Sequence, residues 1–178
     1  MKKVLVITTS LRKNSNSTAL ADSFSRGAEE NGNAVEAISL IDKDIAFCKG
    51  CLVCQQIQKC VIKDDANKIV EKMKNADVIA FATPIYYYEM SGQMKTLLDR
   101  ANPLFPSDYK FRDIYFLASA AENEEDAMDK AVSGLVGWID CFEKASLKGV
   151  VKAIGVTDEG DIEGNASLQE AYEMGKLI

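Results

Sequence analysis

The chain has 178 residues, 47% of them hydrophobic and 27% charged, which is enough apolar material for one domain, 1–178, with a sizeable core. Its net charge of -6 argues against a nucleic-acid or anionic-membrane partner, because either would require a basic face. The apolar run after Lys3 ends at Thr8, far too soon for a signal peptide or a membrane span. We therefore expect a cytoplasmic protein that binds a small molecule.

The chain contains no histidine. This absence excludes Ser-His and Cys-His nucleophile pairs, mixed cysteine-histidine zinc sites and any histidine general base. The remaining chemistry is that of a cofactor.

Apolar runs bounded by turn residues alternate with segments of helical period, which is typical of repeated strand-helix units around a parallel sheet. In chain order, strands are predicted at 4–7, 35–41, 78–82, 114–118 and 150–154. Helices are predicted from the first loop to about 31, over 65–75, from an N-cap at Ser91, along a stripe from 128 to 142, and around 168–172. This pattern favours a flavodoxin-like doubly wound sheet of order 2-1-3-4-5, in which ligands sit beyond the carboxyl ends of the strands.

Three smaller expectations accompany this assignment. Pro84 is predicted to end the third strand, and 157–165 is interpreted as an exposed loop. Cys141, on the long helix, is expected to be a buried structural thiol. Lys95 and Arg100 are interpreted as ordinary surface or interface charges without a catalytic role.

The loop after the first strand, 9–18, is unusually polar. Its hydroxyl and amide side chains can bind phosphate oxygens, and the following helix directs free N–H groups and its positive dipole end at the same place. No Walker pattern and no GxGxxG motif occurs, so a monophosphate ligand fits better than a nucleoside triphosphate or a dinucleotide. The alternative is a capped helix start beside a solvated loop.

The loops after the third and fourth strands lie at the same sheet edge. Thr83-Pro84-Ile85-Tyr86-Tyr87-Tyr88 could place a tyrosine beside a planar ring, in a turn set up by Pro84. The alternative is an aromatic subunit interface. Ser119 and Ala120 would allow a flat ligand to approach the backbone.

Four cysteines lie in the run CKGCLVCQQIQKC: Cys48, Cys51, Cys54 and Cys60. This spacing suits an iron-sulfur cluster or an all-cysteine zinc site, because three thiolates on one loop can converge with a fourth from just beyond it. The alternative is four ordinary free thiols.

Together, these motifs resemble the NADPH-dependent FMN reductase family and especially its iron-sulfur flavoprotein branch. The resemblance covers most of the chain and rests on the segments Ser10-Leu11-Arg12 to Ser15-Asn16-Ser17, Thr83-Pro84-Ile85-Tyr86, Ser91-Gly92-Gln93-Met94-Lys95 with Asp99-Arg100, and the cysteine run leading into Asp64-Asp65. One departure is Thr9, which stands where the family commonly has glycine.

The resemblance implies bound FMN, with the phosphate surrounded by Ser10, Arg12, Ser15, Asn16, Ser17 and Thr18. It places the isoalloxazine ring beside Pro84, Ile85, Tyr86 and Tyr87, and it completes the site with Ser119 and Ala120. It also implies homodimers or homotetramers, and a 4Fe-4S cluster on Cys48, Cys51, Cys54 and Cys60.

Three hypotheses follow. The first is an FMN-dependent oxidoreductase without catalytic side chains, in which NAD(P)H reduces the flavin and a quinone, nitro or azo compound, flavin or metal ion takes the electrons. The second is an electron carrier with FMN and a 4Fe-4S cluster that exchanges electrons with ferredoxin-like proteins. The third is a zinc- or thiol-based redox sensor.

Overall fold

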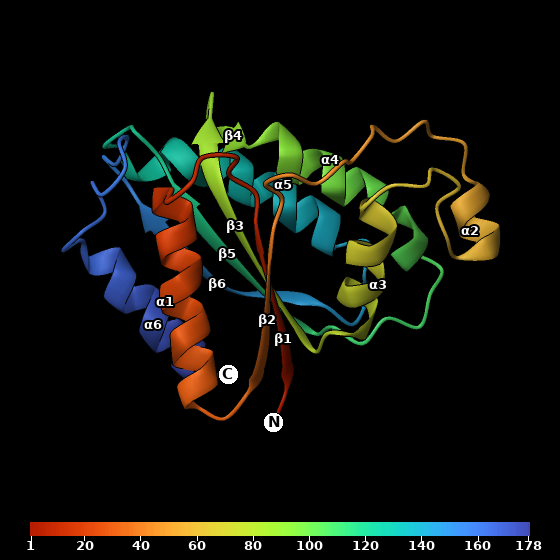
Figure 1. Cartoon of the computed structure of the whole chain (residues 1–178), viewed down its shortest axis with the longest axis horizontal. Coiled ribbons are helices and arrows are strands. Elements are labelled where there is room, and N and C mark those ends of the chain that lie inside the picture. Colours follow the sequence, from red (N-terminus) through yellow and green to blue (C-terminus); the bar gives the residue numbers. More distant parts are fainter.

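The protein is described by a computed structural model that covers residues 1–178. Its five parallel strands are ordered β2-β1-β3-β5-β6, which confirms the predicted order 2-1-3-4-5, and the two-residue strand β4 pairs with β3 in antiparallel fashion (Figure 1). The strands are β1 (Lys3–Thr8), β2 (Ala34–Ser39), β3 (Val78–Tyr86), β4 (Glu89–Met90), β5 (Asp113–Ser119) and β6 (Ser146–Ala153). The helices are α1 (Asn16–Glu30), α2 (Val53–Ile57), α3 (Ala66–Asn75), α4 (Gly92–Arg100), α5 (Asp129–Ile139) and α6 (Ala166–Lys176), with short 3-10 turns η1 (Asn102–Leu104) and η2 (Glu125–Met128).

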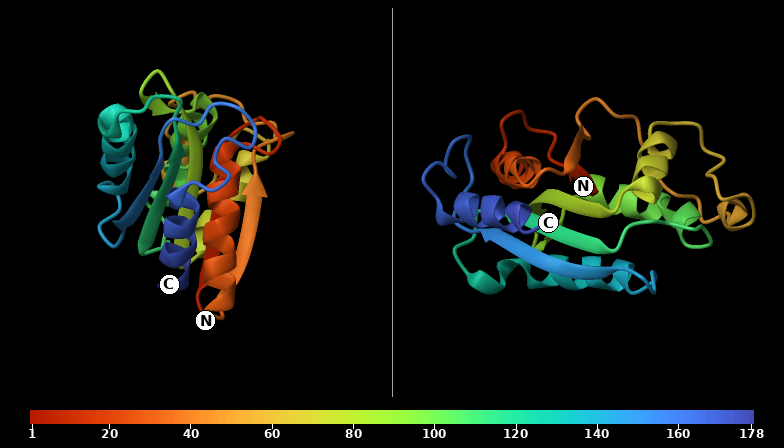
Figure 2. Two further views of the ribbon diagram at one scale, coloured as in Figure 1. Left: turned by 90° about the vertical axis from the view of Figure 1, so that its left-hand side faces the viewer. Right: turned by 90° about the horizontal axis from the view of Figure 1, so that it is seen from below.

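Helices cover both faces of the sheet (Figures 1 and 2). Helices α1 and α6 pack on one face over a core that includes Val6, Phe24 and Leu117. Helices α3, α4 and α5 cover the other face over a larger core that includes Ile7 and Phe116. The central strands β1, β3 and β5 are buried on both faces, which explains why they read as continuous apolar runs rather than as alternating patterns.

Helix starts follow the capping signals in the sequence. The Ser91 hydroxyl accepts the Met94 N–H at the start of α4, as predicted, and the Ser15 hydroxyl accepts the Thr18 N–H at the start of α1. These caps fix where the loops after β1 and β3 end. Both loops therefore meet at the carboxyl edge of the sheet.

The prediction that Pro84 ends the third strand was wrong, because β3 continues to Tyr86. Pro84 lies opposite Ser119, the last residue of β5, so its missing N–H interrupts little of the ladder. Beyond that point, β3 pairs with β4 instead. The strand thus carries Ile85 and Tyr86 past the edge of the parallel sheet.

The expectation of a buried Cys141 was also wrong, since its thiol is exposed. Helix α5 ends at Ile139, two residues earlier than Cys141, and the chain turns there. Phe142, predicted on the same stripe, lies beyond the helix as well but still packs into the core against Trp138. The stripe therefore identified core residues correctly and placed the end of the helix too late.

Helices α1 and α6 approach closely through two glycines. A Cβ at Gly27 would lie 2.0 Å from the carbonyl oxygen of Tyr172, and one at Gly175 would lie 2.0 Å from that of Phe24. We expect Gly27→Ala to lower the free energy of unfolding by about 1–3 kcal/mol, because backbone atoms must move apart. Chemical denaturation measures this loss. Gly137→Ala in α5, where nothing lies within 4 Å, is the matched control and should be neutral or stabilising; equal losses in both variants would contradict the close approach.

Among the helices, none combines the length and the apolar composition needed to cross a membrane.

Candidate functional site

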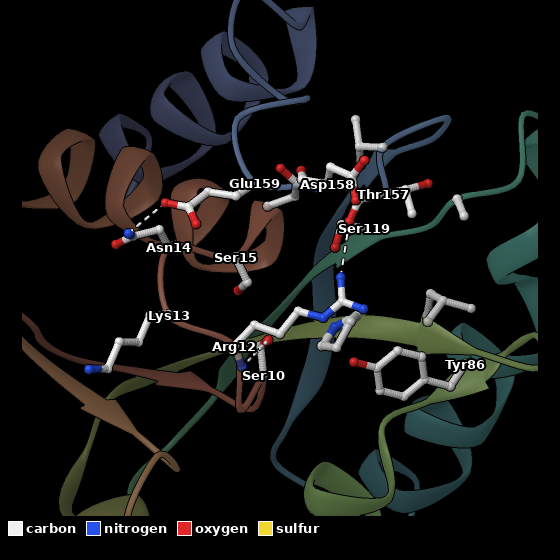
Figure 3. Close-up of a pocket in the computed structure, with 15 residues that line it drawn as sticks. Ser10, Arg12, Lys13, Asn14, Ser15, Tyr86, Ser119, Thr157, Asp158 and Glu159 are labelled. Carbon is white, nitrogen blue, oxygen red and sulfur yellow. Dashed lines mark hydrogen bonds between the residues drawn. The ribbon is translucent and has the colours of Figure 1, made fainter.

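A cavity of about 550 Å³ lies at the carboxyl edge of β1, β3 and β5, where the fold class places ligands. Figure 3 shows Asn14 and Ser15 on one side, Tyr86 on the other, and the Arg12 guanidinium between them. The structure brings eight of the twelve predicted cofactor residues into its wall: Ser10, Arg12, Ser15, Asn16, Pro84, Ile85, Tyr86 and Ser119.

The other four predicted residues do not line the cavity. Ser17 and Thr18 lie within the first turn of α1, where both hydroxyls contact the Ser15 hydroxyl, at 3.2 and 2.9 Å. Tyr87 is 99% exposed at the tip of the hairpin between β3 and β4, and Ala120 is buried in the core. Ser17 and Thr18 thus hold the Ser15 hydroxyl in position through contacts within the first turn of α1.

The first turn of α1 forms one end of the cavity. The N–H groups of its first residues have no carbonyl within the helix to accept them, and the turn contains no acidic side chain. Asn14, with φ of 52°, turns the chain into the helix, and Arg12 adds a positive charge nearby. This end of the cavity therefore suits a phosphate group.

A further wall comes from the loop after β6, for which the sequence predicted only an exposed loop. Arg12 Nη1 donates to the Thr157 carbonyl at 3.1 Å, Asn16 Nδ2 to the Asp158 carbonyl at 3.0 Å, and Asn14 to the Glu159 carboxylate at 2.7 Å. The predicted strand order could have indicated this wall, because the loop that follows each parallel strand begins at the same edge of the sheet.

Asp161 fixes the shape of that loop. Its carboxylate accepts the backbone N–H groups of Thr157 and Asp158, at 2.9 and 2.8 Å. These two hydrogen bonds hold the pKa of Asp161 below its usual value. Two sets of hydrogen bonds thus hold this wall in place. One set comes from the Asp161 carboxylate within the loop, and the other comes from the polar side chains that follow β1.

Thr9 does not obstruct the cavity, although it replaces the glycine common in the similar family. Its side chain is fully buried and points away from the cavity, donating to the Ala82 carbonyl at 3.1 Å and lying 3.0 Å from the Ser91 hydroxyl. The Ser91 N–H in turn donates to the Thr83 hydroxyl. Thr9 therefore links the loop after β1 to the start of α4 through these hydrogen bonds.

The other end of the cavity is formed by the hairpin between β3 and β4. Tyr87 and Tyr88 have φ of 51° and 67°, a conformation that glycine and asparagine adopt far more readily than tyrosine. This turn leaves Tyr86 at the cavity and sends Tyr87 into solvent, while the Tyr88 ring packs against the Lys130 ammonium. The three successive tyrosines thus have three different surroundings.

These features fit FMN. The cavity has the volume of a cofactor site, with hydroxyls and N–H groups at one end, Pro84, Ile85 and Tyr86 at the other, and the Arg12 guanidinium between them. Asn16 Oδ1 is buried without a protein partner, and as an acceptor it suits a hydroxyl of the ribityl chain of FMN and not the phosphate. Ser10, Arg12 and Ser15 would hold the phosphate.

The four cysteines lie elsewhere. None of them lines the cavity, and the segment around α2 lies on the far side of the molecule from α6 (Figure 1). All four are free thiols: Cys48 and Cys51 are exposed, Cys54 is buried and Cys60 is half-buried.

The interpretation of Arg100 as a surface charge was wrong, because its side chain is fully buried. It forms a bidentate ion pair with Asp64, with N···O distances of 2.6 and 2.9 Å. Burial raises the pKa of Asp64, but hydrogen bonds from Arg100 and from the N–H groups of Ala46 and Ala66 outweigh that effect and lower it overall. Lys95 is exposed and pairs with Asp99, as a surface charge does.

As a donor set, four free thiols on one loop match a four-cysteine cluster. The positions of these thiols in the structure do not match a cluster, because no three cysteine or acidic side chains lie close enough together to hold a metal ion. A cluster would therefore require the segment 47–61 to close around it.

Comparison with known proteins gives consistent relationships. Residues 2–151 match the family model of the NADPH-dependent FMN reductases. Over 102 residues, the chain is 41% identical to an iron-sulfur flavoprotein of Methanocaldococcus jannaschii, covering 57% of this chain and 53% of that protein. It is 28% identical over 138 residues to an iron-sulfur flavoprotein of Methanosarcina thermophila, covering 77% and 72%.

The fold is similar to that of an NAD(P)H:quinone oxidoreductase from Methanothermobacter marburgensis, with a TM-score of 0.76 and 20% identity over 98% of this chain and 94% of that one. Among curated relatives, the matched part spans about half the length of the first two, at 53% and 46%.

Proposed function

Because the chain belongs to the NADPH-dependent FMN reductase family, we propose that it is an FMN-dependent oxidoreductase in which NAD(P)H reduces the flavin and a small acceptor takes the electrons. The acceptor class comprises quinones, nitro and azo compounds, flavins and metal ions. We also propose that it forms homodimers or homotetramers, which would cover exposed apolar side chains such as Phe47 and Phe105.

The observation that carries this proposal is the division of the cavity into two ends. Hydroxyls and N–H groups gather at the start of α1, Pro84, Ile85 and Tyr86 line the other end, and the Arg12 guanidinium lies between Ser15 and Tyr86. A ligand with a phosphate at one end and a planar ring at the other satisfies both ends at once. FMN is such a ligand.

When bound, FMN supplies the redox chemistry by accepting hydride from a nicotinamide and releasing electrons to an acceptor. The protein contributes binding and orientation. Ser10, Ser15 and Arg12 would hold the phosphate, beside the wall formed by the loop that Asp161 shapes. Because the chain lacks histidine, protons at the ring would come from solvent or the half-exposed Tyr86 hydroxyl, while backbone N–H groups would donate hydrogen bonds to the ring.

The test is anaerobic reduction of the FMN-loaded protein by NADH and by NADPH, in separate experiments. The proposal expects loss of the visible flavin absorbance with at least one nicotinamide, and its recovery when a quinone is added. A protein that binds FMN but is reduced by neither nicotinamide would contradict the reductase.

Tyr86 and Tyr87 form a matched pair for testing the ring end. We expect Tyr86→Ala to shift the flavin absorption spectrum and to weaken FMN binding by about 2- to 10-fold, because an aromatic contact contributes roughly 0.5–1.5 kcal/mol. Tyr87→Ala removes a fully exposed ring and should leave both unchanged. A spectral titration with FMN measures both effects, and identical behaviour of the two variants would place the ring elsewhere.

The second candidate function is an iron-sulfur flavoprotein that carries electrons between FMN and ferredoxin-like proteins. Two observations favour it: the four free thiols on one loop, and the relationship to iron-sulfur flavoproteins. Anaerobic reconstitution with iron and sulfide distinguishes it from the simple reductase, because only the carrier should take up about four of each per subunit.

A further inference from the structure

One of the four thiols, that of Cys54, lies beside an N–H donor from just beyond the carboxyl end of α4. Asn102, two residues beyond the helix, donates from Nδ2 to the sulfur of the buried Cys54 at 3.2 Å. Arg100, the last residue of α4, is 1% exposed, and its Nε–H is buried without a hydrogen-bond partner.

The remaining N–H groups of Arg100 hold the base of the cysteine loop. Nη1 donates to the Ala46 carbonyl at 2.7 Å, just before the loop, and Nη2 contacts the Ile62 carbonyl at 3.4 Å, just after it. Asp64 accepts the Ala46 N–H at 2.9 Å. The buried ion pair thus fixes both ends of the segment 47–61 to the end of α4.

Asn67 strengthens the same anchor on the side of Cys60. Its Nδ2 donates to the Cys60 carbonyl at 3.3 Å and to the Ile62 carbonyl at 2.8 Å. Cys60 is therefore held through its backbone by α3.

The other two cysteines have no such support. Cys48 and Cys51 are exposed, and the one hydrogen bond to either sulfur comes from the backbone N–H of Gly50, at 3.4 Å from Cys48. The stretch between them includes Gly50, with φ of 64°, and leads into Leu52, with φ of 57°. The first half of the loop is attached to the fold far less firmly than the second half.

We propose that Asn102 and Arg100 are positioning residues for Cys54 and Cys60, the fixed half of a four-cysteine site that Cys48 and Cys51 complete by closure of the exposed half of the loop. Asn102 acts through its N–H···S hydrogen bond to Cys54, and Arg100 acts through its hydrogen bonds to the backbone at both ends of the loop. The proposal rests on the cluster of the second candidate function.

The chemistry of thiolate ligands supports this arrangement. Cysteine binds iron as a thiolate, and an N–H donor beside the sulfur stabilises that negative charge. Hydrogen bonds to the sulfurs also stabilise the reduced, more negative cluster relative to the oxidised one and so raise its reduction potential. Removing the Asn102 donor should therefore weaken iron retention and lower the potential, whereas removing the Arg100 contacts should weaken iron retention by loosening the base of the loop.

The test compares Asn102→Leu and Arg100→Lys with the wild type after anaerobic reconstitution. Leucine keeps the approximate shape of asparagine without its N–H, and lysine keeps the charge of arginine without its fork. We expect both variants to retain FMN and to lose iron to a chelator about 10- to 100-fold more readily, and we expect Asn102→Leu to show in addition a more negative midpoint potential for the cluster. Iron and sulfide content and a redox titration followed by electron paramagnetic resonance measure these changes.

Matched controls lie away from the loop. Asn75 donates only to Glu71, and Arg112 donates to the carbonyls of 109–111, so Asn75→Leu and Arg112→Lys should behave as wild type. If Arg100→Lys does not fold, Asn102→Leu decides the question alone. Wild-type iron retention and potential in Asn102→Leu would overturn the proposal. If the wild type binds FMN but takes up no iron, the iron-sulfur hypothesis is wrong, and this proposal is wrong with it. The proposal of an FMN-dependent reductase would not be affected by that result.

Discussion

Replacing Ser15 with alanine is expected to weaken FMN binding by about 10- to 100-fold. The Ser15 hydroxyl lines the phosphate end of the cavity, caps α1 through the Thr18 N–H and is supported by the Ser17 and Thr18 hydroxyls. A hydrogen bond to a charged group contributes roughly 1.5–3 kcal/mol, which corresponds to this loss of affinity. Arg12→Ala should fall at the lower end of the range, because its side chain is more exposed to solvent. Titration of the protein with FMN gives both values.

A control must separate the lost contact from the lost helix cap, because a cap alone stabilises a helix by about 1 kcal/mol. Asn165 caps α6 by accepting the Ser167 N–H, and it does not line the cavity. Asn165→Ala should therefore lower stability to a similar degree and leave FMN affinity unchanged. Wild-type affinity in Ser15→Ala and Arg12→Ala would remove the phosphate from this end of the cavity.

Replacing Asp64 with leucine is expected to lower the free energy of unfolding by about 3–5 kcal/mol. The change leaves the fully buried Arg100 guanidinium without its counter-charge and leaves the Ala46 and Ala66 N–H groups without an acceptor. The exposed pair of Lys95 and Asp99 has a similarly short N···O distance of 2.6 Å, yet Asp99→Ala should cost less than about 1 kcal/mol because solvent screens it. Denaturant titration measures both variants.

A double-mutant cycle sharpens this test. In Asp64→Leu/Arg100→Met no buried charge is left unpaired, so its loss should be smaller than the sum of the two single losses. Strict additivity, or losses at Asp64 no larger than those at Asp99, would contradict the buried ion pair.

The sequence was sufficient to predict the sheet, because apolar runs and helical stripes report burial directly. Strand order followed, and with it the edge at which the loops after β1, β3 and β5 meet. Pro84 was misjudged because a proline usually ends a strand, and only the register with Ser119 shows that little pairing is lost there. Local sequence does not report the length of the neighbouring strand.

The buried state of Arg100 could not be inferred locally either. An arginine is normally exposed unless it is paired, and its partner Asp64 lies 36 positions earlier in the chain. Aspartates at 64 and 65 after a cysteine run give no indication of which of them turns inward. The tertiary fold decides this, by bringing the end of α4 beneath the loop.

The wall formed by 157–159 was missed for a related reason. Its composition is polar and acidic, as in any solvated loop, and its binding role depends on backbone carbonyls, which every residue has. By contrast, Ser10, Ser15 and Tyr86 could be chosen in advance because their side chains are unusual for their positions. Contacts made by side chains leave a trace in the sequence, whereas contacts made by the backbone do not.

The central claim is that the cavity binds FMN with its phosphate at the start of α1, and a fluorescence titration of flavin-free protein with FMN and with riboflavin tests it most directly. The two ligands share the ring and differ by the phosphate. The structure predicts binding of FMN with one equivalent per subunit, and binding of riboflavin at least about 100-fold weaker, since several charge-assisted hydrogen bonds are lost. Equal affinity for both flavins, or no binding of FMN, would contradict it.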